Sequence, residues 1–174
     1  MVLPAVADLS GQRMLSIIGC GNLNRRDDGV GVVVAQRLQR WLTEWADLPV
    51  QVFDAGTDGM GVMFRARGCD ALVLVDACRT GVEPGAVYEV PGSELAEAPA
   101  SGLNLHEFRW NHALYAGRRL YGEAFPADVT VLLIEAADLG YGLELTPAVA
   151  SAADSVVARL SDMVGAYAVR RAAE

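Results

Sequence analysis

Short apolar runs along the chain have the length and residue types of buried β-strands. Glycine, proline or aspartate closes most of them, as is usual where a strand ends in a turn. The runs cover residues 13–18, 49–53, 71–75, 86–90 and 129–134. The run at 86–90 lies between Gly85 and Pro91, and this flanking pair favours a strand near the edge of a sheet.

Segments with helical periodicity alternate with these runs. Between Val30 and Trp45, apolar residues recur at helical spacing while glutamine and arginine mostly occupy the other side. The pattern predicts helices over residues 30–45, 59–67, 106–120 and 147–170. Thr146 and Pro147 fit an N-cap and a first helical position for the last of these. Residues 91–104 contain proline, serine, glycine and asparagine and are expected to form a loop.

Strands that alternate with helices predict an α/β fold whose mainly parallel sheet is covered on both faces. The length of 174 residues fits a single domain, placed at residues 13–174 after a flexible tail of residues 1–12. In such folds, ligands bind at the carboxyl ends of the strands. Asp28, Asp54 and Asp76 follow three predicted strands, so we expect them to converge at one edge of the sheet.

Composition narrows the range of functions. The chain carries 14 basic and 22 acidic residues, a formal net charge of -8, which disfavours binding to nucleic acid or to anionic membranes. No apolar stretch approaches the ~18 residues of a membrane-spanning helix, and the N-terminus lacks the basic leader of a signal peptide. The cysteines lack the CxxC spacing of a zinc or redox site. We therefore expect a cytoplasmic protein with reduced thiols.

The segment from Gly19 to Gly31 is the first candidate for chemistry. A strand followed by GxG and a helix is typical of dinucleotide-binding sites, but Asn24 replaces the third small residue of that fingerprint. Carboxylates at the start of the following helix would also repel a cofactor phosphate. Asp27 and Asp28 are interpreted either as caps of free amide groups at that helix start or as metal ligands.

Other residues near the strand ends allow more than one interpretation. Gly29 and Gly31 weaken the start of a helix, which indicates that something approaches the backbone closely there. Asp54 fits an Asx-turn as well as a functional role. Asp76 fits a turn cap as well as a site at the mouth of a central strand.

Histidine is scarce, since the chain contains only His106 and His112. Their spacing places them about 240° apart around a helix, so they cannot bind one ion from a shared face. His106 follows a glycine-bearing loop at a predicted helix start, which suits a site. His112 lies between Trp110 and Leu114 and is expected to pack.

Other enzyme motifs are absent from the sequence, namely HExxH, GxSxG and a Walker A loop. Cys20 or Cys78 could serve as a nucleophile with His106 as base, but their apolar surroundings favour an inert thiol. The donors that remain are one imidazole and two or three carboxylates. This set suits a borderline divalent ion with water or a partner in the other positions, and does not identify the metal.

Several motifs follow one another in a fixed order along nearly the whole chain. They are Gly19-x-Gly-Asn22, Asp27-Asp28-Gly-x-Gly31, Asp54-Ala-Gly-Thr57, Leu74-Val-Asp76-Ala77, a loop leading to His106, and Gly142-Leu-Glu-Leu-Thr146-Pro147. This ordered series closely resembles that of the hydrogenase maturation proteases, the endopeptidases specific for [NiFe]-hydrogenase large subunits.

The resemblance implies a three-layer α/β sandwich of the phosphorylase/hydrolase-like type, acting as a monomer on a [NiFe]-hydrogenase large-subunit precursor. The metal-contacting trio of the family falls on Asp28, Asp76 and His106, and Asp54 matches a further acidic position implicated in activity. The family is thought to sense nickel already inserted in the precursor and then to remove its C-terminal extension. The nickel then belongs to the substrate, and other divalent ions such as zinc or cadmium can occupy the site.

The chain departs from the family pattern around its histidine. The family often has proline or alanine before this residue and glutamine after it, whereas here the run is Leu-His106-Glu. His112 therefore stays an alternative ligand. Near residues 135–139 the usual Pro-Glu pair is also missing.

The expected mechanism is that Asp28, Asp76 and His106 complete the coordination of substrate nickel and so place the scissile bond at the enzyme. Nickel or a carboxylate, with Asp54 as the candidate, then activates water or polarises the carbonyl. Two other hypotheses remain open: a resident-metal hydrolase of small peptides, and a nickel-dependent hydrogenase chaperone that does not cut.

Overall fold

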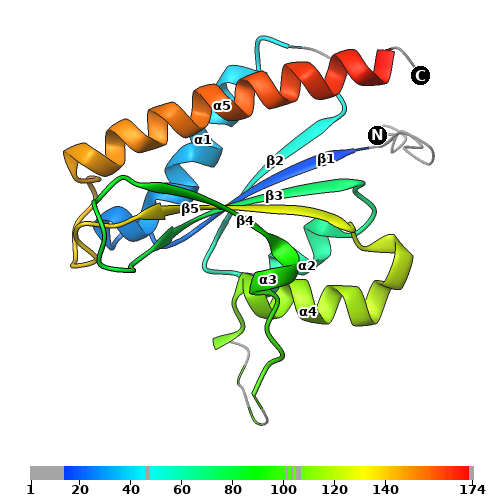
Figure 1. The fold of residues 1–174 in the computed structure, drawn as a ribbon, viewed down its shortest axis with the longest axis horizontal. Helices are drawn as coiled ribbons and strands as arrows, with labels where there is room; N and C mark the ends of the chain where they lie inside the picture. Colours follow the sequence, from blue (N-terminus) through cyan, green and yellow to red (C-terminus); the bar gives the residue numbers. More distant parts are fainter. Residues whose placement is uncertain (1–13, 46–47, 101, 103, 105–106, 173–174) are drawn as a thin grey trace, which may run out of the picture.

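The strands assemble into a five-stranded sheet in the order β2-β1-β3-β5-β4 (Figure 1). They are β1 (Leu15–Cys20), β2 (Val50–Gly56), β3 (Ala71–Cys78), β4 (Val87–Pro91) and β5 (Asp128–Glu135). Neighbouring strands run parallel except at the edge, where β4 pairs antiparallel with β5. The predicted α/β fold with a mostly parallel sheet is therefore confirmed, and so is the edge position of the strand near residues 86–90.

This computed structural model describes residues 14–45, 48–100, 102, 104 and 107–172. The predicted N-terminal tail of residues 1–12 lies outside the described residues. Among those described, no helix has the length and apolar character needed to cross a membrane.

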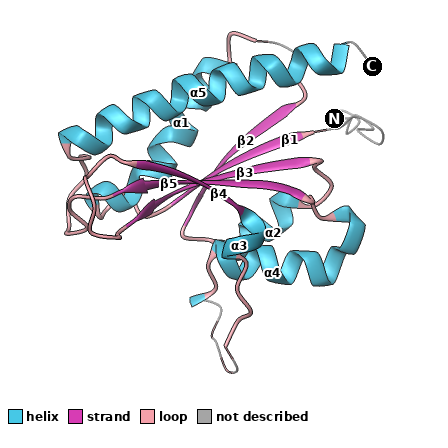
Figure 2. Ribbon diagram, in the orientation of Figure 1, coloured by secondary structure: helices cyan, strands magenta, loops and turns pink. Residues whose placement is uncertain are grey.

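Helices cover both faces of the sheet (Figure 2). Helices α1 (Val30–Leu42) and α5 (Pro147–Ala172) pack on one face, and α2 (Gly59–Ala66) and α4 (Trp110–Tyr121) pack on the other. Shorter helical pieces are the 3-10 turns η1 (Arg26–Gly29) and η3 (Gly122–Ala124) and the single turn α3 (Gly92–Leu95). The result is a three-layer sandwich, as expected.

The central strands are apolar on both sides because both sides are buried. In β1, Ile17 packs with the cluster of α1 and α5, whereas Ile18 packs with the cluster of α2 and α4. In β3, Val73 and Leu74 divide between the faces in the same way. Successive side chains of a strand point to opposite faces, so a doubly covered strand has no polar side and reads as a continuous apolar run.

Several helix boundaries differ from the sequence-based expectation. The stretch 91–104, expected to be a loop, contains α3, a single turn whose C-cap amide, that of Ala96, donates to the Gly92 carbonyl at 3.1 Å. Helix α4 begins at Trp110 rather than near residue 106, and α1 ends at Leu42 rather than at Trp45. Apolar periodicity locates a helix well but leaves its ends open, because end positions depend on local capping bonds.

The strand order places a topological switch point between β1 and β3. From β1 the chain crosses through α1 to β2 on one side, and then through α2 to β3 on the other side of β1. The connection after β1 therefore leads toward β2 and the connection after β3 leads the other way, toward β4, which opens a crevice between them. The residues at this crevice are the natural place to look for a site.

Candidate active site

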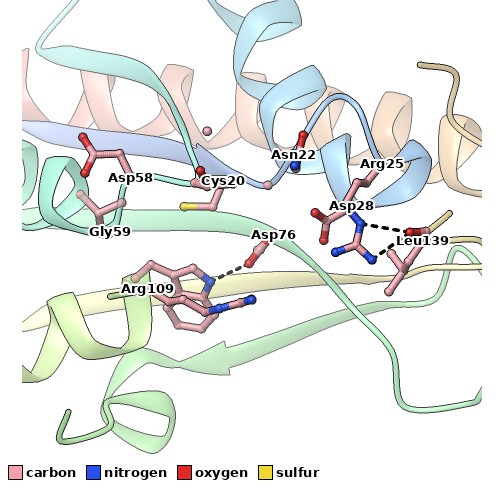
Figure 3. Close-up of a pocket in the computed structure, with 14 residues that line it drawn as sticks. Cys20, Asn22, Arg25, Asp28, Asp58, Gly59, Asp76, Arg109 and Leu139 are labelled. Atoms are coloured by element: carbon pink, nitrogen blue, oxygen red, sulfur yellow. Dashed lines mark hydrogen bonds between the residues drawn. The ribbon is translucent and has the colours of Figure 1, made fainter. Parts of the chain in front are cut away.

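A pocket of about 470 Å³ occupies this crevice (Figure 3). Its walls come from the connection after β1, the start of α2, the end of β3, the start of α4 and the loop after β5. The lining residues are Cys20, Gly21, Asn22, Arg25, Asp28, Gly56, Thr57, Asp58, Gly59, Val62, Asp76, Arg109, Trp110 and Leu139. Asp28 and Asp76, separated by 48 positions in the sequence (76 − 28), thus meet in one pocket, as expected from the strand pattern.

Glycine holds the connection after β1 tight enough to bring Asp28 into the pocket. A Cβ on Gly21, which has φ +127°, would lie 1.8 Å from the Asp28 carbonyl oxygen, and a Cβ on Gly31 would lie 2.1 Å from that of Val75. The close approach predicted from the glycines therefore exists, and the neighbour is the backbone of this chain itself. Because α1 sits directly on β1 and β3, Asp28 in η1 is held beside the end of β3.

Asp76 lies inside β3, two residues before its end, and is held at both oxygens. Its Oδ1 accepts a hydrogen bond from the Ala77 amide at 2.8 Å, and its Oδ2 accepts one from Nε1 of Trp110 at 2.6 Å. Burial raises the pKa of Asp76 to about 6, and the nearby Asp28 carboxylate adds to the rise, while the Trp110 and Ala77 hydrogen bonds and Arg109 oppose it. A carboxyl group so perturbed in a crevice is typical of a functional site.

Asp28 supplies the second carboxylate of the pocket. It is partly buried, and its side chain has no hydrogen-bond partner within the described part of the chain. Two neighbouring carboxylates repel each other, and a divalent cation between them would relieve that repulsion. Among the described residues there is no group of three or more metal-binding side chains, so these acids alone do not make a closed metal site.

Of the two histidines, only His112 belongs to the described residues. His106 lies outside the described residues, so its predicted place beside Asp28 and Asp76 stays a prediction. His112 sits in the first turn of α4, where its Nδ1 accepts a hydrogen bond from the Arg109 amide at 3.2 Å. Its ring lies against Phe108 at 5.7 Å between centroids, and it does not line the pocket. His112 therefore has a structural role that matches the expectation of a packed residue.

Asp54 does not line the pocket that contains Asp28 and Asp76. It lies inside β2 and borders a neighbouring hollow of about 350 Å³, which shares Gly21 and Gly56 with the pocket. Its Oδ1 accepts from the Gly56 amide and its Oδ2 from Nε2 of Gln36, both at 2.9 Å. The Gly56 bond is the Asx-turn that the sequence allowed.

Of the two interpretations of Asp27 and Asp28, the structure contradicts the one in which they cap their own helix. Neither η1 nor α1 has a side-chain cap. The Asp27 carboxylate is fully buried and accepts hydrogen bonds from the amides of Ala137, Asp138 and Thr146 and from the Thr146 hydroxyl, at 2.7–3.0 Å. It therefore ties the loop after β5 and the start of α5 to the connection after β1.

Sequence reasoning missed four charged or aromatic side chains of the pocket: Arg25, Asp58, Arg109 and Trp110. Arg25 stood inside the candidate motif, so its position was a usable signal. Trp110 and Arg109 open α4, and their contact with β3 depends on how that helix packs. Cys20 also lines the pocket, and burial raises the pKa of its thiol well above the ordinary value, with Asp76 and Asp54 adding to the rise. An inert thiol was expected there.

Comparison with known sequences gives one consistent answer. The family model described as hydrogenase maturation protease matches residues 32–163, a range that starts just after Asp28 and contains Asp54 and Asp76. The hydrogenase expression/formation protein HupD of Thiocapsa roseopersicina is 31% identical over 75% of this chain and 58% of its own length. A putative hydrogenase maturation protease of Methanocaldococcus jannaschii is 32% identical over 52% of this chain and 58% of its own length. The chain thus spans less than two thirds of both relatives.

Solved structures share the fold at low sequence identity. The [NiFe] hydrogenase maturation protease HycI from Thermococcus kodakarensis superposes with a TM-score of 0.67 at 19% identity, over 90% of this chain and 96% of that one. The hydrogenase maturating endopeptidase HybD from Escherichia coli gives 0.63 at 19% identity, over 86% and 93%. At this identity the likeness supports the three-layer fold and no more.

Proposed function

The chain belongs to the hydrogenase maturation protease family, and on that premise we propose that it removes the C-terminal extension of a [NiFe]-hydrogenase large-subunit precursor after nickel insertion. The observation that carries the proposal is the pairing of Asp28 and Asp76 in one pocket at the switch point of the sheet. Two carboxylates form an incomplete ligand set, which suits an ion that arrives already held by the substrate.

In the proposed reaction, the nickel is part of the substrate. Asp28 and Asp76, with His106 as the third ligand, bind the nickel of the precursor and so fix the peptide bond to be cut against the pocket. The Trp110 and Ala77 hydrogen bonds hold the Asp76 carboxylate in one orientation, which limits where the ion can sit. Holding the peptide bond in the reactive geometry lowers the activation free energy of hydrolysis, because the entropy cost of orienting it is met on binding.

The proposed reaction also needs a group that activates the attacking water. Asp54 stays a prediction for this role, although both of its oxygens accept hydrogen bonds and it borders the hollow next to the pocket. Hydrolysis adds the hydroxyl of water to the acyl carbon and its proton to the leaving amine, so a base near the nickel speeds the attack.

The test mixes the purified protein with nickel-loaded and nickel-free precursor and follows the mass of the precursor. We expect shortening of the loaded form alone. Alanine at Asp28, Asp76 or His106 should abolish shortening and leave the melting temperature close to that of the unaltered protein. Asp162→Ala serves as the control, because this exposed acid lies on α5 away from the pocket.

Other outcomes would replace the proposal. Tight binding of loaded precursor without shortening would make the protein a nickel-dependent chaperone. Cleavage of small peptides by a protein purified with its own metal would make it a resident-metal hydrolase.

A further inference from the structure

Two arginines share the pocket with its three acids, Asp28, Asp58 and Asp76, and the proposed reaction has not used them. Arg25 comes from the connection after β1, and Arg109 is the residue before the first turn of α4. In Figure 3 the Arg109 guanidinium lies near Asp76, and the Arg25 guanidinium lies between Asp28 and Leu139. The pocket therefore offers a place for a cation and, next to it, a place for an anion.

Arg25 is oriented by the loop after β5. Its Nε and Nη2 donate to the Leu139 carbonyl oxygen at 3.2 and 3.0 Å, and Leu139 itself lines the pocket. These two bonds fix the plane of the guanidinium group. They leave Nη1 without a hydrogen bond to any residue in the described part of the chain. A preoriented guanidinium loses little freedom when it binds a planar anion.

The backbone of Arg109 is held by hydrogen bonds, whereas its guanidinium group is free to bind a ligand. Its amide donates to His112 and its carbonyl accepts from the Ala113 amide, so the base of the side chain is held by α4. Its guanidinium makes no hydrogen bond or ion pair with a described residue, although its charge is close enough to lower the pKa of Asp76. Arg109 is thus an uncommitted positive charge at the pocket wall.

We propose that Arg25 and Arg109 form a carboxylate-binding subsite beside the ion held by Asp28 and Asp76. Guanidinium groups bind carboxylates through paired, charge-assisted hydrogen bonds. The inference rests on the proposed function, since hydrolysis of a peptide bond creates a new α-carboxylate at this position. An acidic side chain of the precursor near the cut is the other source of the same group.

The acids of the pocket explain why the subsite would need the ion. Asp28, Asp58 and Asp76 line the same pocket and oppose any anion there. A divalent ion on Asp28 and Asp76 reverses that balance, so a carboxylate beside it meets two guanidinium groups and a cation. Carboxylate binding should therefore be measured with nickel present.

The test is calorimetric titration of the full chain, with nickel ions, against a peptide that matches the last residues of the mature large subunit. One probe carries a free α-carboxylate, and a second is amidated at that end. A third is amidated and carries a glutamate near the end. We expect the unaltered protein to bind at least one carboxylate-bearing probe about tenfold more tightly than the amidated one, and the probe that gains identifies the source.

Substitutions assign that preference to the arginines. Arg109→Gln should lose it without loss of folding, because the Arg109 guanidinium makes no hydrogen bond or ion pair with a described residue. Arg25→Lys keeps the positive charge but loses the planar guanidinium group that donates paired hydrogen bonds, and should weaken the preference. Arg40→Gln removes the same charge from the exposed end of α1 and should retain it. Equal affinities for all three probes, or a preference that survives in Arg109→Gln, would overturn the subsite.

The subsite and the proposed function can fail separately. If the unaltered protein prefers a carboxylate but never shortens loaded precursor, the subsite stands and the proposed function is wrong. If it shortens the precursor and shows no carboxylate preference, the proposed function stands and the subsite is wrong.

Discussion

Asp28 and Asp76 have different surroundings, although the sequence presents each simply as an acid near a strand end. Asp76 is bonded at both oxygens, whereas Asp28 has no hydrogen-bond partner within the described ranges. Burial is the main reason that the pKa of Asp76 rises to about 6. Of these two acids, Asp76 is therefore the more firmly held, and it is also the one whose charge changes close to physiological pH.

This pKa predicts a pH dependence of processing. The Asp76 carboxylate must be ionised to bind nickel, so kcat/KM for loaded precursor should fall by about tenfold per pH unit below the titration midpoint near 6. A carboxyl ¹³C NMR titration of the metal-free protein should place the Asp76 midpoint in the same range. A midpoint at the ordinary 3.8 would contradict the burial argument.

The same shift has a consequence for stability, and its sign is opposite to that of a salt-bridged acid. Because the folded-state pKa lies above the ordinary value, the folded protein holds its proton more strongly than the unfolded chain between pH 3.8 and about 6. The contribution of Asp76 to stability is therefore present at low pH and is lost as the pH rises through that window. Function at neutral pH is gained at some cost in stability.

Trp110 offers a direct check on what holds Asp76. Its Nε1–H favours the ionised form of Asp76, so Trp110→Phe should move the midpoint of the carboxyl titration upward while keeping an aromatic ring against the sheet. NMR on the metal-free variant measures the shift. Trp45→Phe, at an exposed position outside the pocket, should leave the midpoint unchanged. An unchanged midpoint in Trp110→Phe would show that the Trp110 hydrogen bond does not affect the pKa of Asp76.

At the scale of elements, two buried carboxylates join the connections at the carboxyl edge of the sheet. Asp27 holds residues 137, 138 and 146, and Glu135 accepts from the amides of Thr80 and Gly81, the Thr80 hydroxyl and the Cys78 thiol. Burial favours the neutral form of Glu135, but these donors together outweigh it and lower its pKa. The loops around the pocket are thus fixed by hydrogen bonds from their backbone amides to these two buried carboxyl groups.

The contact of α1 with the sheet gives a test at this scale. Gly31→Ala would place a Cβ 2.1 Å from the Val75 carbonyl oxygen, so α1 must move away from β1 and β3, at a cost of about 1–3 kcal/mol of unfolding free energy. Gly165→Ala is the matched control in α5, where a Cβ meets nothing within 4 Å. That variant should gain about 0.5–1 kcal/mol in urea unfolding, because alanine restricts the unfolded chain. Equal stabilities would contradict the packing argument.

Over the whole molecule, stability comes from two apolar clusters, one on each face of the sheet. Asp28 and Asp76, the side chains that could take a cation, line the pocket and belong to neither cluster. A folded state that binds no ion of its own gains nothing from free metal. The molecule should therefore keep its fold when divalent ions are removed.

Chelation tests this directly. Addition of EDTA to the purified protein should leave the melting temperature unchanged in differential scanning calorimetry, because nickel is expected to arrive with the substrate. A resident structural metal would instead lower the melting temperature on chelation, and zinc would restore it. That result would favour the resident-metal hydrolase.

The sequence by itself determined the layers and the meeting of two acids. Apolar runs marked the strands and helical periodicity marked the helices that cover them, because local pattern encodes which sides of an element are buried. Parallel strands end at a common edge of the sheet, so the sequence alone predicted that Asp28 and Asp76 lie close together.

Only the tertiary structure decided which polar groups touch. Asp27 bonds the start of α5, Trp110 bonds Asp76, and Arg25 bonds Leu139, each across many residues of chain. The tertiary structure also places Asp54 at the neighbouring hollow, and it pairs the His112 ring with the Arg109 amide at the start of α4. Such contacts depend on loop conformation and on how helices pack against the sheet. Both are set by the whole fold, and no local spacing of residues records them.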